Sequence, residues 1–119
     1  MPVMKVNVSR KLSDNELEAL KTELGETLNL VPGKAPEQLI LILEEGLAMY
    51  MGDDELEVSA YVEAMYCGEF RYKIKNDFVA AIFDAVMKAL NMPMDRVFVE
   101  INELEGLGGF GDLRDEYLL

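Results

Sequence analysis

The chain contains no histidine and no tryptophan, and Cys67 is the one cysteine among its 119 residues. Without histidine, the usual general base and zinc ligand are missing, as is every serine–histidine or cysteine–histidine nucleophile pair. A single cysteine also excludes an internal disulfide and any Cys-x-x-Cys zinc or redox motif. We therefore expect neither a metal site nor a cofactor, and acid–base chemistry must rest on other groups.

Positive charge is scarce as well, since 11 Lys and Arg residues face 23 Asp and Glu residues and the net charge is −12 at pH 7. Such a charge repels nucleic acid phosphates and anionic membrane surfaces, which excludes a nucleic acid partner. No apolar run reaches the length of a signal-peptide core or of a membrane span. We therefore expect a cytoplasmic protein with no membrane partner.

The first half of the chain predicts a strand, a helix and a second strand. Residues 2–8 alternate between apolar and polar side chains, which favours a strand. Ser13 and Glu16 form a capping box that begins a helix over 14–29. The apolar run LILIL at 39–43 is typical of a strand buried on both faces.

The second half repeats this order, with a strand over 56–66, a helix over 78–90 and a strand over 96–102. The chain thus reads as two β-α-β units, about 2–44 and 56–105, followed by a tail over 106–119 whose glycines predict a flexible turn. Each unit is too small to be stable alone. We predict one α+β domain over 1–119, with a four-stranded sheet and both helices on one face.

Two helices cannot cover both faces of such a sheet. In the strand over 96–102, Phe98, Glu100 and Asn102 lie on the face away from the helices, because side chains alternate along a strand. The LILIL run has no polar side that could face water. We therefore infer that another subunit covers the second face.

The proline that follows Met1, the loop GKAPEQL and the segment DRVFVEI together resemble the tautomerase superfamily over about residues 2–105. The most similar branch is that of macrophage migration inhibitory factor. The resemblance implies a homotrimer in which three sheets surround a central barrel, with active sites between adjacent subunits. It also implies a small keto or enol acid as the molecular partner.

The resemblance further implies the roles of three residues. Pro2 matches the catalytic proline, whose amine acts as a general base after Met1 is removed, and Lys34 matches the lysine that contacts the substrate carboxylate. Cys67 stands where the branch has an isoleucine whose backbone amide binds substrate. A free α-amine titrates near pH 8 and burial lowers its pKa, so such an amine can serve as a base without histidine.

Three positions depart from the branch. Phe98 replaces a tyrosine and Glu100 an asparagine, both at positions that enter the neighbouring subunit's site, and Phe110 is the nearest aromatic replacement in an altered tail. For Glu100 the sequence leaves three roles open: pairing with Lys34 or Lys5, raising the pKa of the proline amine, or selecting a different substrate.

The main hypothesis is a keto–enol tautomerase of a small 2-oxo acid, similar to an arylpyruvate. The alternative is a catalytically silent trimer that binds a ligand or a protein, in which Pro2 is only a proline at the head of a strand. Hydration or dehalogenation is a third possibility, but it depends on arginines that have no counterpart here.

Overall fold

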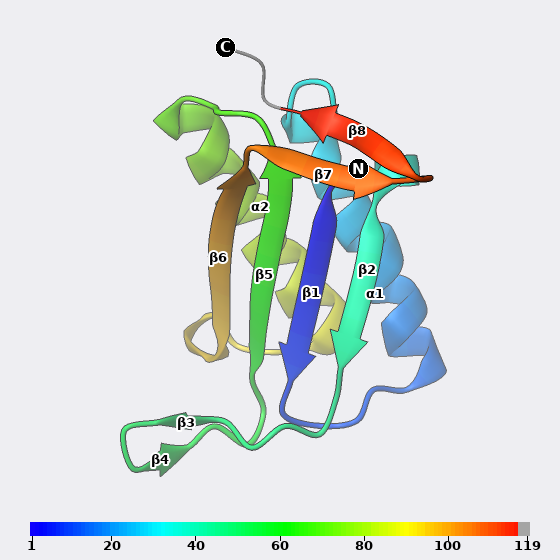
Figure 1. The fold of residues 1–119 in the computed structure, drawn as a ribbon. Coiled ribbons are helices and arrows are strands. Elements are labelled where there is room, and N and C mark those ends of the chain that lie inside the picture. Colours follow the sequence, from blue (N-terminus) through cyan, green and yellow to red (C-terminus); the bar gives the residue numbers. More distant parts are fainter. Residues whose placement is uncertain (117–119) are drawn as a thin grey trace.

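A four-stranded mixed sheet with two helices on one face forms the body of the computed structural model, which describes residues 1–116 (Figure 1). The strand order is β2-β1-β5-β6, and the pairs β1–β2 and β5–β6 are parallel whereas β1–β5 is antiparallel. These strands are β1 (Val3–Val8), β2 (Ile40–Glu44), β5 (Ala60–Cys67) and β6 (Val97–Leu104). The predicted α+β fold, built from two β-α-β units, is confirmed. The last residues of the predicted tail, 117–119, lie outside the described part of the chain.

The helices are α1 (Asp14–Thr27) and α2 (Tyr72–Leu90). The predicted capping box is present at α1, because the Ser13 side chain accepts from the Glu16 N–H and the Glu16 side chain accepts from the Ser13 N–H. A 3₁₀ turn (Leu28–Leu30) replaces the end of the predicted helix. Two further 3₁₀ turns, Pro36–Gln38 and Met94–Arg96, precede β2 and β6.

The predicted start of α2 at residue 78 was wrong by six residues, because the helix begins at Tyr72. Its added turns, residues 72–77, are mostly polar and mostly exposed, so they lack the apolar spacing that marked the rest of the helix. The buried face of α2 points toward the sheet. It comprises Phe78, Ile82, Ala85, Val86 and Leu90.

The core lies between the helices and one face of the sheet. Alternate residues of β1 and β5 are fully buried there, while their neighbours in sequence lie on the other face. The core residues of these strands are Met4, Val6, Val8, Ala60, Val62, Ala64 and Tyr66. Within residues 1–116, no helix is both long enough and apolar enough to cross a membrane.

A small hairpin that the sequence did not predict projects from the end of the sheet at which β1 ends (Figure 1). It pairs β3 (Tyr50–Met51) with β4 (Asp54–Glu55). The Leu56 N–H then bonds to the Met49 carbonyl at 2.8 Å, which extends the hairpin. The segment from residue 56 therefore belongs to the hairpin, and the strand predicted over 56–66 begins only at Ala60.

The glycine-rich tail is not the flexible turn that the sequence predicted. It forms a second hairpin of β7 (Gly106–Gly109) and β8 (Asp112–Glu116), with Phe110 and Gly111 at positive φ in the turn. Figure 1 shows this hairpin passing across the end of the sheet at which β1 begins. Glycines give no alternating pattern, so only main-chain pairing and packing against the sheet end reveal these strands.

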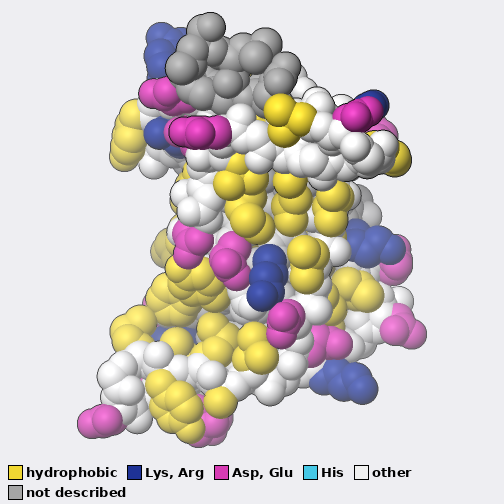
Figure 2. Space-filling model, viewed as in Figure 1, with side chains coloured by type: hydrophobic (Ala, Val, Ile, Leu, Met, Phe, Trp, Pro, Cys, Tyr) yellow, Lys and Arg dark blue, Asp and Glu magenta, His cyan; other side chains and the backbone are white. Residues whose placement is uncertain are grey.

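The face of the sheet away from the helices is open in the single chain. Figure 2 shows apolar side chains on it above and below a central band of charged ones. Ile40 and Ile42 of the LILIL run are 44% and 43% exposed. The prediction that this strand is buried on both faces is thus not met within one chain, and a covering subunit stays a prediction.

Candidate active site

Pro2 is buried at the entry to β1, and its carbonyl accepts a 2.9 Å hydrogen bond from the Ile40 N–H. This bond begins the pairing of β1 with β2. The missing N–H of Pro2 costs nothing at this position, because the proline precedes the first residue of the strand. With Met1 attached, the Pro2 nitrogen is an amide nitrogen and has no basicity.

The free amine of the chain belongs to Met1 and is partly buried. It forms an ion pair with Asp115 Oδ2 of β8, and only 17% of the Met1 side chain is exposed. Burial and the positive charge of Lys34 lower the pKa of this amine, and the Cys67 thiol opposes them weakly. The structure therefore brings Lys34 and Cys67 to the same end of the sheet as Pro2.

Strand direction explains why these residues meet. Val3 of β1 lies opposite Ile40 in the parallel strand β2 and opposite Met65 in the antiparallel strand β5. The loop that leads into β2, with Lys34, and the last residue of β5, Cys67, must therefore flank the start of β1. A turn at Gly33 (φ 80°) and a 3.1 Å bond from the Lys34 N–H to the Val31 carbonyl shape the loop.

Asp115 was missed by the sequence analysis. Its strand reads DLRDE, in which charged residues dominate and no apolar face marks a strand. The one available signal was the glycine-rich stretch between two short segments, which is compatible with a hairpin turn. That pattern does not show which side chain of the hairpin reaches the amine.

Phe98 and Glu100 lie elsewhere on the open face. The Tyr61 hydroxyl donates to Glu100 Oε1 at 2.6 Å, and Asn102 Nδ2 donates to Glu100 Oε2 at 2.6 Å. Hydrogen bonding from Tyr61, and then from Asn102, lowers the pKa of Glu100. Of the three roles left open for Glu100, pairing with Lys34 or Lys5 does not occur among the described residues of the single chain, where Glu100 is held by its strand neighbours.

Lys5, the other expected partner of Glu100, pairs with Glu44 at 3.3 Å. The two residues lie close together because β1 and β2 are parallel neighbours whose register places Asn7 opposite Glu44. Glu100 instead lies one strand further from Lys5, beyond Glu63. The geometry of the sheet therefore favours Glu44 as the partner.

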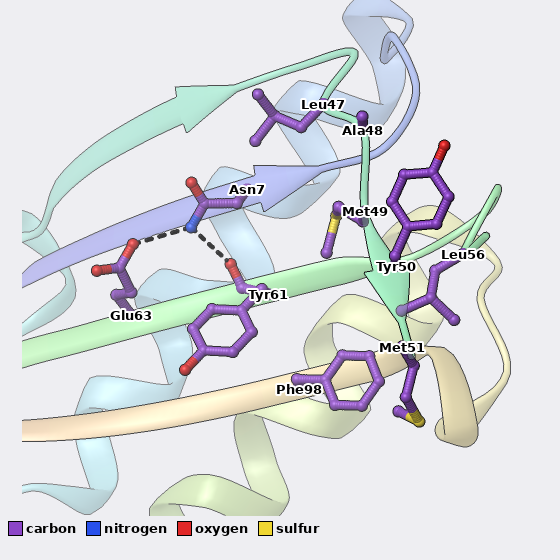
Figure 3. Close-up of a pocket in the computed structure, with 10 residues that line it drawn as sticks. All are labelled: Asn7, Leu47, Ala48, Met49, Tyr50, Met51, Leu56, Tyr61, Glu63 and Phe98. Atoms are coloured by element: carbon purple, nitrogen blue, oxygen red, sulfur yellow. Dashed lines mark hydrogen bonds between the residues drawn. The ribbon is translucent and has the colours of Figure 1, made fainter. Parts of the chain in front are cut away.

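A pocket among the described residues surrounds Phe98, not Pro2. It is open, has a volume of about 700 Å³, and lies between the sheet and the segment that forms β3 (Figure 3). The rings of Tyr61 and Phe98 are stacked with centroids 6.5 Å apart. Asn7 crosses the pocket floor, donating to the Tyr61 carbonyl at 3.0 Å and to Glu63 Oε2 at 2.9 Å.

Phe110 lies in the turn of the β7–β8 hairpin and is 87% exposed. Its ring contacts the Arg114 guanidinium, whose carbon lies 5.4 Å from the ring centroid. In the single chain, Phe110 therefore does not line a pocket with Pro2.

No protein-family model matches the chain, and no curated protein matches its sequence. Several solved structures are similar to it in fold. Leishmania major MIF2 has a TM-score of 0.85 and 20% identity over 96% of this chain and 97% of that chain. The Q0 fused 4-OT has a TM-score of 0.83 and 18% identity over 93% and 94%. N1, a member of the cis-3-chloroacrylic acid dehalogenase family, has a TM-score of 0.84 and 20% identity over 96% and 84%.

The chain has the tautomerase-superfamily fold. In this tautomerase fold the N-terminal residue lies at one end of the sheet and Phe98 at the other. Tyr61, opposite Phe98, precedes Met65, opposite Val3, by four residues on β5. At the rise of an extended strand this is a separation of about 13 Å along the sheet. One chain therefore does not bring Phe98 and Glu100 to Pro2.

Proposed function

We propose that this protein is a cofactor-free tautomerase that moves a proton between carbon and oxygen of a small 2-oxo acid. Its base would be the Pro2 amine, exposed by removal of Met1. The observation that carries the proposal is the position of the partly buried N-terminal amine near Lys34, at one end of a tautomerase fold. MIF2 and the fused 4-OT, both similar in fold, support it.

The chemistry needs one base and two binding groups. A neutral Pro2 amine takes the proton from the carbon beside the keto group, and the electron pair of the broken C–H bond becomes the C=C bond of the enol. The carbonyl oxygen gains the negative charge and receives the proton from the Pro2 ammonium. Lys34 holds the substrate carboxylate, and the Cys67 backbone amide supports the developing oxyanion.

The electrostatics at the terminus suit a base that works near neutral pH. Burial and Lys34 lower the pKa of the amine in the chain that carries Met1. After removal of Met1, the free amine lies one residue further along, on Pro2, which is itself buried. An ordinary α-amine has a pKa near 8, so a lowered value leaves a larger neutral fraction at pH 7.

The site is completed by a neighbouring subunit in a homotrimer. Phe98 and Glu100 lie too far from Pro2 in their own chain, while the exposed Ile40 and Ile42 leave the open face without cover. The fused 4-OT structures are trimers. In such an assembly the pocket around Phe98 faces the Pro2 end of the next chain, and Phe110 becomes part of the same wall.

A second candidate is a trimer that binds a ligand or a protein without turnover. Glu100 favours it, because hydrogen bonds from Tyr61 and Asn102 keep this carboxylate ionised. A fixed negative charge in the site repels an acidic substrate. Under this reading, the Pro2 amine would have no chemical role.

The deciding experiment is the ultraviolet assay of phenylenolpyruvate conversion, on protein whose intact mass shows that Met1 is absent. We expect turnover that Pro2→Ala abolishes while sedimentation still shows a trimer. Turnover unaffected by Pro2→Ala would exclude the amine as the base. No turnover in a processed trimer would favour the binding module.

A reactivity probe complements this assay. The compound 2-oxo-3-pentynoate inactivates Pt0534, a structure with a TM-score of 0.81 and 12% identity to this chain. A neutral secondary amine adds to its activated alkyne, so we expect one adduct on Pro2 by peptide mass spectrometry. Chain that retains Met1 is the control, because there the Pro2 nitrogen is an amide. Equal labelling of Pro2-derived peptides in both forms would contradict the proposal.

A further inference from the structure

The tautomerase chemistry just proposed leaves one carboxylate at the N-terminal amine without a role. Asp115 Oδ2 is buried and in contact with the Met1 amine. Within residues 1–116, no other hydrogen-bond donor satisfies this oxygen. The Asp115 side chain is 23% exposed, but its buried Oδ2 depends on this one cation, and leaving a buried carboxylate oxygen without a partner is costly.

The hairpin that carries Asp115 is fixed against the sheet. Asp115 lies opposite Leu107 in the β7–β8 pairing, and its carbonyl accepts from Cys67 Sγ at 3.4 Å. Gly109 of β7 packs so closely on Met1 that a Cβ there would lie 2.6 Å from Met1 Cε. The Cys67 contact holds β8 against β5 whether or not Met1 is present, whereas the Gly109 contact exists only in the chain that retains Met1.

Removal of Met1 shifts the free amine by only one residue. Standard bond lengths separate successive backbone nitrogens by about 3 to 3.6 Å. The Pro2 amine then falls within reach of the Asp115 carboxylate, either directly or through one water. No other partner for Asp115 Oδ2 is present among the described residues, so the new ammonium is the natural replacement for the lost one.

We propose that Asp115 is the counter-ion of the processed N-terminus, pairing with the Pro2 ammonium and thereby holding the β7–β8 hairpin over the amine. The proposal shares with the proposed function only the removal of Met1 and does not depend on turnover. It makes Asp115 a positioning residue, because its carboxylate acts on the amine and not on the substrate.

The charged and titratable groups that act on the amine come from three elements. Lys34, in the loop before β2, disfavours the ammonium. Asp115 on β8, its ion-pair partner, favours it, and so does Cys67 at the end of β5. Lys34 and Asp115 therefore shift the pKa of the Pro2 amine in opposite directions. Loss of Asp115 removes the carboxylate that opposes Lys34 and therefore lowers the pKa of the Pro2 amine.

The test is a titration of the Pro2 amine by ¹⁵N NMR in protein labelled with ¹⁵N-proline, after methionine aminopeptidase has removed Met1. We expect Asp115→Asn to lower the pKa of Pro2 by about 1 or more. The matched control is Asp112→Asn, which removes the same charge from an exposed position of the same hairpin. Asp115→Glu keeps the charge and is expected to keep the pKa near that of the unmodified chain.

Equal Pro2 pKa values in Asp115→Asn and Asp112→Asn would overturn the proposal. A second measurement needs no variant. In the unmodified chain, the ¹³Cγ resonance of Asp115 should show an inflection at the pKa of Pro2, since paired groups sense each other's titration. The absence of this inflection would also overturn it, even if Asp115→Asn failed to fold.

Neither readout requires a substrate, so the two proposals can fail separately. A lowered Pro2 pKa in Asp115→Asn without any tautomerase turnover would retain the counter-ion and reject the enzyme. If turnover depended on Pro2 but the pKa of Pro2 were unchanged in Asp115→Asn, the enzyme would be retained and the counter-ion rejected.

Discussion

Met1 and Gly109 are in direct contact where the C-terminal hairpin crosses the start of the chain. A Cβ built on Gly109 would lie 2.6 Å from Met1 Cε and 3.0 Å from Met1 Sδ. The absence of a side chain on Gly109 thus makes room for the initiator methionine. The β7–β8 hairpin, which would cover the site, therefore packs against Met1, the residue that must be removed for the proposed chemistry.

Gly109→Ala should therefore destabilise the chain only while Met1 is present. We expect a loss of about 1 kcal/mol, at the low end for overpacking because a methionine side chain can rotate away. Urea unfolding of the Met1-retaining and processed forms measures the difference. Gly108→Ala is the control, since a Cβ on Gly108 would lie 3.5 Å from the Asp112 carbonyl oxygen and would not approach Met1. Equal losses in both forms would contradict the contact.

Lys34→Gln should move the pH profile of turnover in the direction opposite to Asp115→Asn. Lys34 lowers the pKa of the N-terminal amine, so its removal raises that pKa and shifts the rise of kcat/KM to higher pH. Loss of the carboxylate contact should also raise KM at least tenfold, in line with the strength of charge-assisted bonds. Lys11→Gln, at an exposed site, is the control. An unchanged profile would remove Lys34 from the site.

Ile42→Glu should prevent assembly. Ile42 is 43% exposed on the open face of the sheet, where a partner subunit would bury it, and a buried unpaired carboxylate is strongly unfavourable. Sedimentation velocity should show a monomer, with turnover lost because Phe98 no longer reaches another chain's Pro2. Leu30→Glu is matched in exposure, at 47%, but lies in the 3₁₀ turn after α1. Intact trimers of Ile42→Glu would place the interface elsewhere.

Arg10→Gln should weaken the fold near neutral pH more than in acid. Arg10 bonds both oxygens of Glu16, at 3.0 and 2.7 Å, and holds the pKa of Glu16 at about 2. Because this pKa is depressed in the folded state, its stabilisation is present above about pH 4.5 and is lost as the pH falls toward about 2. Urea midpoints at pH 6 and pH 2.5 measure the contrast.

The control for this contrast is Lys73→Gln, which removes an exposed pair with Asp77 one turn along α2. Such surface pairs contribute little at any pH, so we expect a small and similar effect at both. If Arg10→Gln behaved the same way, the Arg10–Glu16 pair would have no special role in joining the end of β1 to α1.

Local signals were reliable where one residue pattern maps to one element. The Ser13–Glu16 capping box placed the start of α1 correctly, because the hydrogen bonds that satisfy a helix end are made within four residues. The alternation around Phe98 and Glu100 placed both side chains on the open face. The start of α2 was missed because its first turns face water and carry no pattern.

The interaction partners of individual side chains were harder to predict from the sequence. Glu100 accepts from Tyr61, which is 39 residues away, because β5 and β6 are parallel neighbours in one register. Asp115 reaches Met1 only because the tail folds back as a hairpin across the sheet end. Both relationships join segments distant in sequence, and no periodicity within either segment encodes them.

The sequence by itself determined the absence of histidine chemistry, the two β-α-β units and the proline at the second position. These follow from composition and from patterns that repeat over a few residues. Only the tertiary structure decided that Pro2, Lys34, Cys67 and Asp115 share one end of the sheet while Phe98 and Glu100 lie toward the other. The physical reason is that strand direction and register, fixed by packing of the whole core, set the distances between residues far apart in the chain.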